Sequence, residues 1–480
     1  MPQYHLVILV HGLWGNSSHM AYLAQSLQNA KISDSQEILV VHRTESHSGY
    51  LTYDGIGVNG KRVADEITTE KLKLEKDGKV VKFSIIGYSM GGLIARYALG
   101  ILKHDGFFDE VEPVNFVTFC TPHVGAINPS KSLSSRMFNI VAPCILSHTG
   151  SEMFLRDKPV VKAKKSLSLL EWMANPASKF YKALESFENR TAYANIINDK
   201  RTSWYTTAID DRDPFNSMIN ESSEAYSLNY IRGYEPTVID VTKHFSFNAI
   251  EEPNTSKIDL RSIIFKAFSW CKVLGHLVLV MPIYSLLLFG NYMWQRIQLS
   301  QRLKQFAKES SESLNVLYEW INDEIDGGMA KLETSKSTMS GYDSSHEVSG
   351  NYLSQFEETV RGETDLLVES IYGAMNNADY HEYNSRVIPP AAIAQGDCPE
   401  ASPLLSDSTA KETEDNFQLN LTPAQKNIVR HLNALEWKKF PVIIRKTKAS
   451  HAAVIYRHPD PNFAEGETVV RHFLNEVFRG

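Results

Sequence analysis

The sequence predicts an α/β fold with a mostly parallel central sheet and helices on both faces. Short apolar runs typical of buried strands alternate with helical patterns from the first residues onward. The run at 81–86 leads directly into the pentapeptide 87–91 (GYSMG), and a helical pattern begins at once after it. A strand, a tight turn and a helix in direct succession form the core of such a fold.

The other elements of this fold are expected along both ends of the chain. An apolar strand at 4–10 is followed by a helix that Ser17 caps and that extends to about residue 29. The expected elements after it are a strand at 37–42, a helix at 59–76, strands at 114–120 and 191–197, a helix at 422–435, a strand at 440–445 and a closing helix at 467–478.

Composition divides the chain into three parts. Residues 1–245 form the first part of the core, with a candidate lid at 128–182 that is equally well explained as a plain helical excursion. Residues 246–420 are interpreted as an insertion, because Ser, Glu, Asp, Thr and Gly dominate from 300 to 418, as in partly disordered chain. Residues 421–480 complete the core.

The stretch 273–295 contains 23 residues without Asp, Glu, Lys or Arg. As one straight helix it would be about 34 Å long, enough to cross a bilayer. A complete crossing would separate the core segments before and after it, and Pro282 near its middle would kink a helix. We therefore expect a hairpin in one lipid leaflet; a complete span and a buried helical hairpin in the core are the alternatives.

Overall composition limits the partners, cofactors and cellular location that we expect. The 480 residues carry a net charge of −7, which does not favour nucleic acid as a partner. The four cysteines have no metal-ligand spacing and are expected to be reduced thiols: Cys120, Cys144, Cys271 and Cys398. No basic and apolar leader is visible, so we expect a cytosolic chain that is not secreted. No metal and no cofactor are predicted.

Ser89 is the candidate nucleophile. In a G-x-S-x-G turn between strand and helix the serine hydroxyl projects above the sheet, and small residues are needed two positions away on each side. Gly87 and Gly91 occupy those positions. The alternative is a glycine-rich turn with an unreactive serine.

The backbone N–H groups of Leu13 and Met90 are the candidate oxyanion donors. Leu13 follows His11-Gly12 at the end of the first strand, and Met90 follows the serine at the start of a helix. His11 and His123 are candidates for the pocket, since each lies at the carboxyl end of a strand.

The serine also needs an acid and a base. Asp199 lies just beyond the strand at 191–197, where the acid of a Ser…Asp…His order belongs. His451 lies on the loop after the last strand, where the base belongs. Alternatives remain open for the acid (Asp210, Asp211 and Asp213) and for the base (His458 and His472).

With these residues placed, the chain resembles the fungal serine-esterase/lipase family of α/β-hydrolases. The segments that carry the likeness are 6–16 (LVILVHGLWGN), 85–98 (IIGYSMGGLIARYA), 121–125 (TPHVG), 195–209 (NIINDKRTSWYTTAI) and 451–457 (HAAVIYR). The resemblance implies hydrolysis of acyl esters in glycerophospholipids and residence on lipid droplets, whose phospholipid monolayer suits a hairpin.

The sequence therefore predicts a serine lipase or phospholipase acting on phospholipid or acylglycerol at a lipid monolayer or at the cytosolic face of a membrane. A monoacylglycerol lipase or another acyl (thio)esterase is an alternative, because acyl-chain and headgroup choice depend on the lid and the insertion. A membrane-associated interaction protein with an inactive hydrolase fold is the alternative outside enzymes. The oligomeric state is left open.

Overall fold

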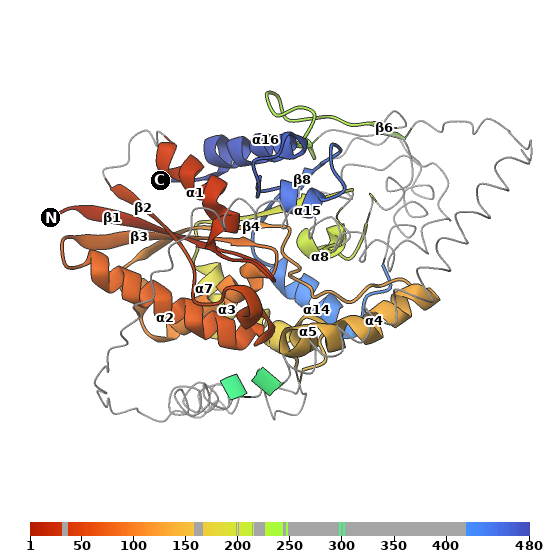
Figure 1. Ribbon diagram of the computed structural model, residues 1–480, viewed down its shortest axis with the longest axis horizontal. Helices are drawn as coiled ribbons and strands as arrows, with labels where there is room; N and C mark the ends of the chain where they lie inside the picture. The colour runs from red at the N-terminus through yellow and green to blue at the C-terminus, as the bar shows by residue number, and fades with distance from the viewer. Residues whose placement is uncertain are drawn as a thin grey trace, which may run out of the picture.

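The computed structural model describes residues 1–30, 37–157, 167–197, 199, 201–213, 215, 226–242, 246–247, 297–298, 301–302 and 419–480. Within these residues the core is a parallel sheet of six strands in the order β2-β1-β3-β4-β5-β8 (Figure 1). Its strands are β1 (Gln3–Val10), β2 (Ile38–Arg43), β3 (Lys79–Tyr88), β4 (Glu112–Phe119), β5 (Asn189–Asn195) and β8 (Lys438–Val442). The strands β6 (Tyr226–Ser227) and β7 (Ser246–Phe247) form a separate antiparallel pair.

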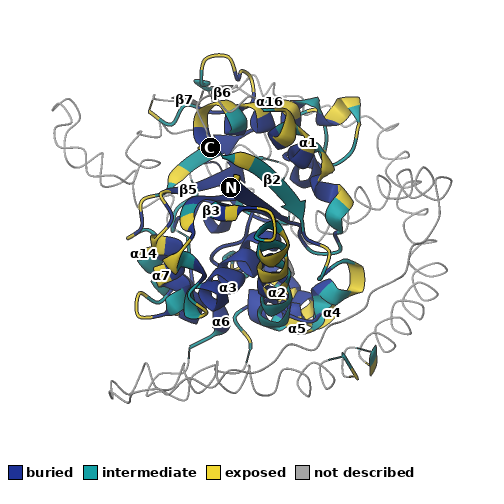
Figure 2. Cartoon of the chain, turned by 90° about the vertical axis from the view of Figure 1, so that its left-hand side faces the viewer, coloured by how far each residue is buried: buried dark blue, intermediate teal, exposed yellow. Residues whose placement is uncertain are grey.

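Helices cover both faces of this sheet (Figures 1 and 2). One face carries α2 (Ile56–Leu74), α3 (Gly91–His104), α7 (Lys179–Glu185) and α14 (Pro423–Leu432), and the other carries α1 (Ala21–Asn29) and α16 (Ala464–His472). The remaining helical segments are η1 (Ser17–Met20), η2 (Gly49–Tyr53), η3 (Phe107–Asp109), α4 (Leu133–Ile145), α5 (Ser147–Met153), α6 (Leu169–Met173), α8 (Trp204–Thr207), α15 (Ser450–Ala453), η8 (Pro461–Phe463) and the π-helical turn η9 (Phe473–Val477).

Each strand of the sheet centre is buried on both sides. In β1, Leu6, Ile8 and Val10 belong to the core under α2 and α3, whereas Val7 and Leu9 belong to the core under α1 and α16. This explains why the strand is a continuous apolar run rather than an alternating one. The predicted α/β fold, a parallel sheet with helices on both faces, is confirmed.

Two local predictions need correction. The sequence predicts Ser17 as the cap of the first helix, but Asn16 takes this place: its side chain accepts the N–H of Ser18, and a 3-10 turn precedes α1. The last strand is predicted at 440–445, but β8 spans Lys438–Val442, because its pairing with β5 begins at Lys438 and ends at Val442. The helix after the insertion begins as expected, with Thr422 in a capping box and Pro423 at the first position.

The strand order places a crevice at the carboxyl ends of β1 and β3. From β1 the chain first continues to β2 on one side and then returns to β3 on the other side. Loops that leave two such neighbouring strands diverge over opposite faces of the sheet, and ligands of open α/β sheets bind at this switch point. The loop after Val10 and the turn after Tyr88 meet here.

The predicted lid and the predicted membrane hairpin have different outcomes. The predicted lid at 128–182 contains α4, α5, α6 and the beginning of α7. The hairpin candidate at 273–295 and almost all of the predicted insertion lie outside the described residues. Among the residues that are described, no helix is long and apolar enough to cross a membrane.

Glu152 joins α5 to the beginning of α2. Its buried carboxylate accepts the N–H of Ile56 and lies 3.5 Å from Nδ1 of His148. Beside it, the Thr149 hydroxyl donates to the Thr52 carbonyl at 2.6 Å and accepts the N–H of Gly55 at 3.0 Å. Burial raises the pKa of Glu152 to about 8, so this carboxyl binds its proton more tightly in the folded chain than in the unfolded chain.

We expect Glu152→Gln to flatten the pH dependence of stability. A group whose folded pKa is raised stabilises the fold most fully below its ordinary pKa of 4.5 and progressively less as the pH rises to about 8. Glutamine keeps an oxygen for the Ile56 N–H but cannot ionise. We expect the free energy of unfolding, measured with urea, to decrease between pH 5.5 and pH 8. The decrease should be larger in the wild type than in the variant by roughly 1–3 kcal/mol. Equal losses in both proteins would contradict this assignment.

Candidate active site

Ser89 lies at a sharp turn between β3 and α3. Its φ of 55° is in the left-handed region that non-glycine residues rarely adopt. Three hydrogen bonds hold it there: its N–H donates to the Phe119 carbonyl at 2.8 Å, and its carbonyl accepts the Gly92 N–H at 3.2 Å and the Thr121 hydroxyl at 2.8 Å. The surrounding structure thus fixes a strained backbone that displays the hydroxyl.

The turn can form only because glycines occupy its flanks. A Cβ on Gly91 would lie 2.2 Å from the Val10 carbonyl oxygen, and one on Gly87 would lie 2.3 Å from the Cα of Gly92. A Cβ on Gly12 would lie 2.7 Å from the Cβ of Ser89. The loop after β1 and the turn after β3 therefore approach each other more closely than any side chain would allow.

The structure brings Ser89, His451 and Asp199 into one hydrogen-bonded series. Nε2 of His451 lies 2.9 Å from Oγ of Ser89, and Nδ1 lies 2.8 Å from Oδ2 of Asp199. The side chains of His451 and Asp199 are 2% and 1% exposed. A carboxylate only accepts hydrogen bonds, so the geometry assigns the proton to Nδ1 and leaves Nε2 to accept from the serine.

The Asp199 carboxylate has further partners that the sequence did not indicate. Oδ1 accepts the N–H of Thr202 at 2.9 Å and that of Arg201 at 3.1 Å, and Oδ2 accepts the Thr202 hydroxyl at 3.0 Å. Burial alone would raise the pKa of Asp199, but the attraction of His451 and these hydrogen bonds lower it. Asp199 is therefore ionised at neutral pH.

The alternative acids and bases lie elsewhere. Asp210 is 3.7 Å from Arg212, and burial raises its pKa. His472 bonds the Tyr193 hydroxyl at 2.7 Å, and the His458 ring packs on Phe463 with centroids 5.9 Å apart. Of the acids and bases that the sequence left open, Asp199 and His451 are the ones that the structure places beside the serine.

Leu13 and Met90 line the same cavity as Ser89 and His451. Leu13 is carried by the loop after β1, and Met90 is the N-terminal cap of α3. No acceptor among the described residues is bonded to either N–H. Their positions on two sides of the serine fit the expected oxyanion donors, and this role remains a proposal.

His11 supports the loop after β1 and is not among the residues that line the cavity. Its ring stacks on that of His47 with centroids 3.9 Å apart, and Nε2 of His47 lies 3.2 Å from the His11 carbonyl. Burial lowers the pKa of His11 to about 4 and that of His47 to about 3, so both rings are neutral.

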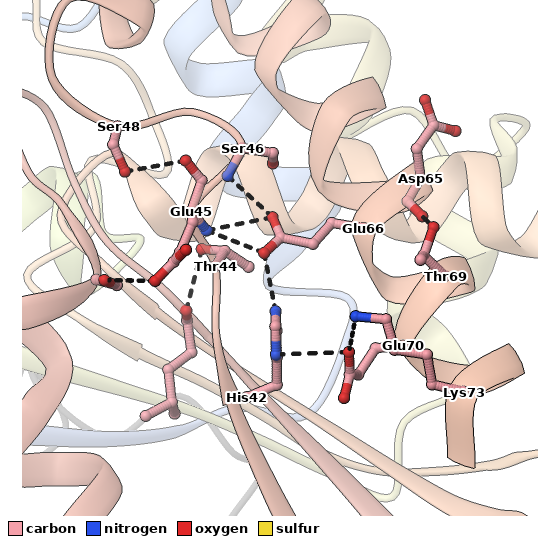
Figure 3. Close-up of polar contacts among 12 residues, drawn as sticks. His42, Thr44, Glu45, Ser46, Ser48, Asp65, Glu66, Thr69, Glu70 and Lys73 are labelled. Carbon is pink, nitrogen blue, oxygen red and sulfur yellow. Dashed lines mark hydrogen bonds and ion pairs between the residues drawn. The ribbon is translucent and has the colours of Figure 1, made fainter. Parts of the chain in front are cut away.

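Glu66 on α2 fixes the loop that carries His47 (Figure 3). Its carboxylate accepts the N–H groups of Glu45 and Ser46 and lies 2.8 Å from Nε2 of His42. Burial opposes its ionisation, but these hydrogen bonds lower the pKa of Glu66 to about 2. A charged side chain thus positions the loop on which the His11–His47 stack depends.

His123 is likewise buried and is not among the residues that line the cavity. Its Nε2 bonds the Thr118 hydroxyl at 3.0 Å, and its ring packs on Trp437 with centroids 5.2 Å apart. Burial, and then the neighbouring Arg96, lower its pKa well below the usual value. The structure therefore gives His123 a place in the core.

The cavity at Ser89 is lined mostly by apolar residues and also by two arginines. Its polar and charged lining residues are Tyr88, Ser89, Arg201, Thr202, His451 and Arg457. The rest of its lining is apolar: Leu13, Trp14, Met90, Ala126, Phe138, Leu146, Met153 and Phe154. Such a lining suits a ligand with a hydrocarbon chain and an anionic group.

One set of metal-ligand atoms overlaps this site. Ligand atoms of Cys120, Asp199 and His451 lie within 4.8 Å of one another. Both ring nitrogens of His451 are already bonded, to Asp199 and to Ser89. A metal ion here would have to replace the hydrogen bonds of the series, so the donor set does not fit a resident metal.

Comparison with known proteins finds a family and several relatives that are similar to part of this chain. Residues 2–211 match the family described as "Putative serine esterase (DUF676)". The chain is 30% identical over 218 residues to "Putative lipase YDL109C" and 28% identical over 215 residues to "Putative lipase ROG1", both of Saccharomyces cerevisiae. Each match covers 43% of this chain but only 30% and 28% of the respective relative, so the chain spans less than a third of these proteins.

Two solved structures are distant. "RedJ with PEG molecule bound in the active site" is 15% identical and covers 30% of this chain and 56% of its own. A "Lipase-esterase related protein from Clostridium acetobutylicum ATCC 824" is 18% identical and covers 30% and 54%. The TM-score of each is 0.20, so neither likeness carries an argument here.

We expect Gly91→Ala and Gly57→Ala to have opposite effects. A Cβ at position 91 would collide with the backbone after β1, whereas a Cβ at position 57 in α2 meets Tyr97 at an ordinary 3.5 Å. Gly57→Ala should stabilise the protein by about 0.5–1 kcal/mol, as alanine does within a helix. Gly91→Ala should lower the melting temperature and the reactivity of Ser89 towards a fluorophosphonate. A Gly91→Ala protein that melts and reacts like the wild type would show that the close approach is not required.

Proposed function

We propose that this chain, which carries a serine esterase domain over residues 2–211, hydrolyses acyl esters of glycerophospholipids at a lipid surface. The observation that carries the proposal is the buried series from Ser89 Oγ through His451 to Asp199. An imidazole between a hydroxyl and an ionised carboxylate is the arrangement that removal of the serine proton requires.

In the first half-reaction, Oγ of Ser89 attacks the acyl carbonyl carbon while its proton passes to Nε2 of His451. The ionised Asp199 stabilises the imidazolium that forms. The carbonyl oxygen becomes an oxyanion, which the N–H groups of Leu13 and Met90 stabilise; such donors are worth about 3–4 kcal/mol each in comparable sites. Collapse breaks the ester bond, and the leaving alkoxide takes the proton from Nε2.

In the second half-reaction, a water molecule repeats the attack on the acyl-serine. His451 takes a proton from this water, and the resulting tetrahedral species again forms its oxyanion between the two backbone donors. When it collapses, Ser89 recovers its proton from Nε2 and the fatty acid is released. The net reactants of the cycle are ester and water, and the enzyme returns to its starting state.

The two-sided cavity supports the choice of phospholipid. The apolar wall fits an acyl chain, and the guanidinium groups of Arg201 and Arg457 fit a phosphate diester close to the scissile bond. A monoacylglycerol or a thioester offers the same acyl chain to the wall but has no phosphate that the two arginines could bind. We therefore favour a phospholipid substrate over those alternatives, and a lipid droplet monolayer or cytosolic membrane face as the place of action.

Loss of the serine or of the acid should separate catalysis from folding. We expect Ser89→Ala to lose roughly 10⁴-fold or more of the ester hydrolysis rate and all labelling by a fluorophosphonate, with an unchanged melting temperature. Asp199→Asn should lose about 10³–10⁴-fold in kcat, because the amide no longer holds the proton on Nδ1. Wild-type protein that neither hydrolyses esters nor reacts with the probe would instead favour an interaction protein with an inactive fold.

The arginines should affect phospholipid and neutral esters differently. We expect Arg201→Gln with Arg457→Gln to lower kcat/KM for a phosphatidyl substrate roughly 10- to 100-fold, as loss of charge-assisted hydrogen bonds does. Hydrolysis of a monoacylglycerol should change less than about threefold. Arg479→Gln, at an exposed pair with Glu188, is the matched control. An equal loss on both substrates would assign the arginines to the structure of the site and not to headgroup recognition.

A further inference from the structure

The helix α4 exposes an apolar outer face. Ten large apolar side chains are exposed in the described part of the chain, and five of them belong to this one helix. They are Leu133 (76% exposed), Met137 (58%), Ile140 (59%), Val141 (37%) and Ile145 (52%). Exposing so much apolar surface on one element costs free energy unless something covers it in use.

These five residues form one stripe, because their spacings of three, four and one bring them to the same side of a helix. The opposite side of the helix, including Phe138, is buried, and Phe138 lines the cavity together with Leu146 at the C-terminal cap of α4. The same helix thus separates the cavity at Ser89 from the outer apolar face. Figure 1 shows α4 continuing from α5 away from the sheet.

Charge near the stripe favours an anionic surface. Lys131 and Arg136 are exposed at the beginning of α4. No Asp or Glu occurs between residues 113 and 151 of the sequence. An apolar helix face flanked by basic residues, in a stretch of chain without Asp or Glu, is the pattern of a helix that lies in the interface of a membrane with anionic lipids.

We propose that the outer face of α4 docks into an anionic phospholipid surface and holds the cavity of Ser89 against it. The inference rests on the proposed function for the meaning of the cavity, but docking itself requires no catalysis. Lipid is the favoured occupant because the helix that carries the stripe also lines the apolar cavity, and because the exposed charged residues next to the stripe along the chain, Lys131 and Arg136, are cations. A second copy of the chain or another segment covering the stripe are the outcomes that would contradict it.

Binding to vesicles tests the proposal directly. The full chain carrying Ser89→Ala should co-sediment with vesicles of phosphatidylcholine and phosphatidylserine. Leu133→Gln, Met137→Gln and Ile140→Gln together should weaken this binding roughly tenfold or more, since glutamine keeps the helix but removes the apolar face. Ile38→Gln with Leu72→Gln removes comparably exposed side chains from β2 and α2 and should have no effect.

The basic residues should act only where the lipid is charged. Lys131→Gln with Arg136→Gln should weaken binding to vesicles that contain phosphatidylserine and leave binding to pure phosphatidylcholine unchanged. In a chain with Ser89 intact, the triple glutamine variant should hydrolyse a dissolved short-chain nitrophenyl ester at the wild-type rate and lose activity on vesicles only. Equal loss on the dissolved ester would show damage to the site.

Cys144 provides a reporter within the same helix as the stripe. It is exposed on α4, whereas Cys120 is buried. An environment-sensitive dye on Cys144, in a chain with Cys271→Ser and Cys398→Ser, should shift to shorter wavelength when vesicles are added. The same dye on Leu72→Cys, with Cys144→Ser also introduced, should not shift.

Three results would overturn the proposal. They are wild-type vesicle binding by the triple glutamine variant, a Cys144 dye already in an apolar environment without lipid, and an oligomer that this variant converts to monomers. Vesicle binding that depends on the stripe, in a wild-type protein without esterase activity, would support docking while removing the proposed function. Activity on dissolved esters without vesicle binding would support ester hydrolysis at Ser89 and contradict docking through α4.

Discussion

The site depends on one imidazole that bridges two parts of the chain far apart in sequence. His451 bonds Ser89 and Asp199, which precede it by 362 and 252 residues. Its backbone carbonyl also accepts the Tyr88 hydroxyl at 2.9 Å, and the neighbouring Ser450 carbonyl accepts the Asn195 amide at 3.1 Å. These bonds exist only because β8 returns to pair with β5, so the C-terminal part of the core brings His451 to the serine.

The order of the parallel strands brings the three residues to the same edge of the sheet. β3, β4, β5 and β8 are neighbours whose carboxyl ends share one edge, and the proposed nucleophile, acid and base follow β3, β5 and β8. Asp199 follows the end of β5 by four residues, and His451 follows the end of β8 by nine. The register of β5 against β8 therefore sets the position of His451 relative to Asp199, and a shift of one residue would separate the two.

Elements outside the sheet supply most of the cavity lining and the exposed apolar face. The predicted lid segment supplies α4 and α5, which give the cavity much of its apolar wall, and the loops after β5 and β8 supply its two arginines. The same helix α4 is apolar on its outer face. The proposed hydrolysis and the proposed docking to lipid thus rest on different elements, so they can be tested separately.

The sequence by itself determined the strands, the glycine-flanked turn and the order of serine, acid and base, because these follow from local apolar patterns and from chain order. It left Asp199 among four acids and His451 among three histidines, since only the pairing of β5 with β8 brings one of each to Ser89. It placed His11 and His123 in the pocket, whereas tertiary packing buries both against other rings. The fixing of Asp199 by Thr202 and the exposed face of α4 were likewise decided by tertiary structure, because burial depends on which neighbours each residue meets.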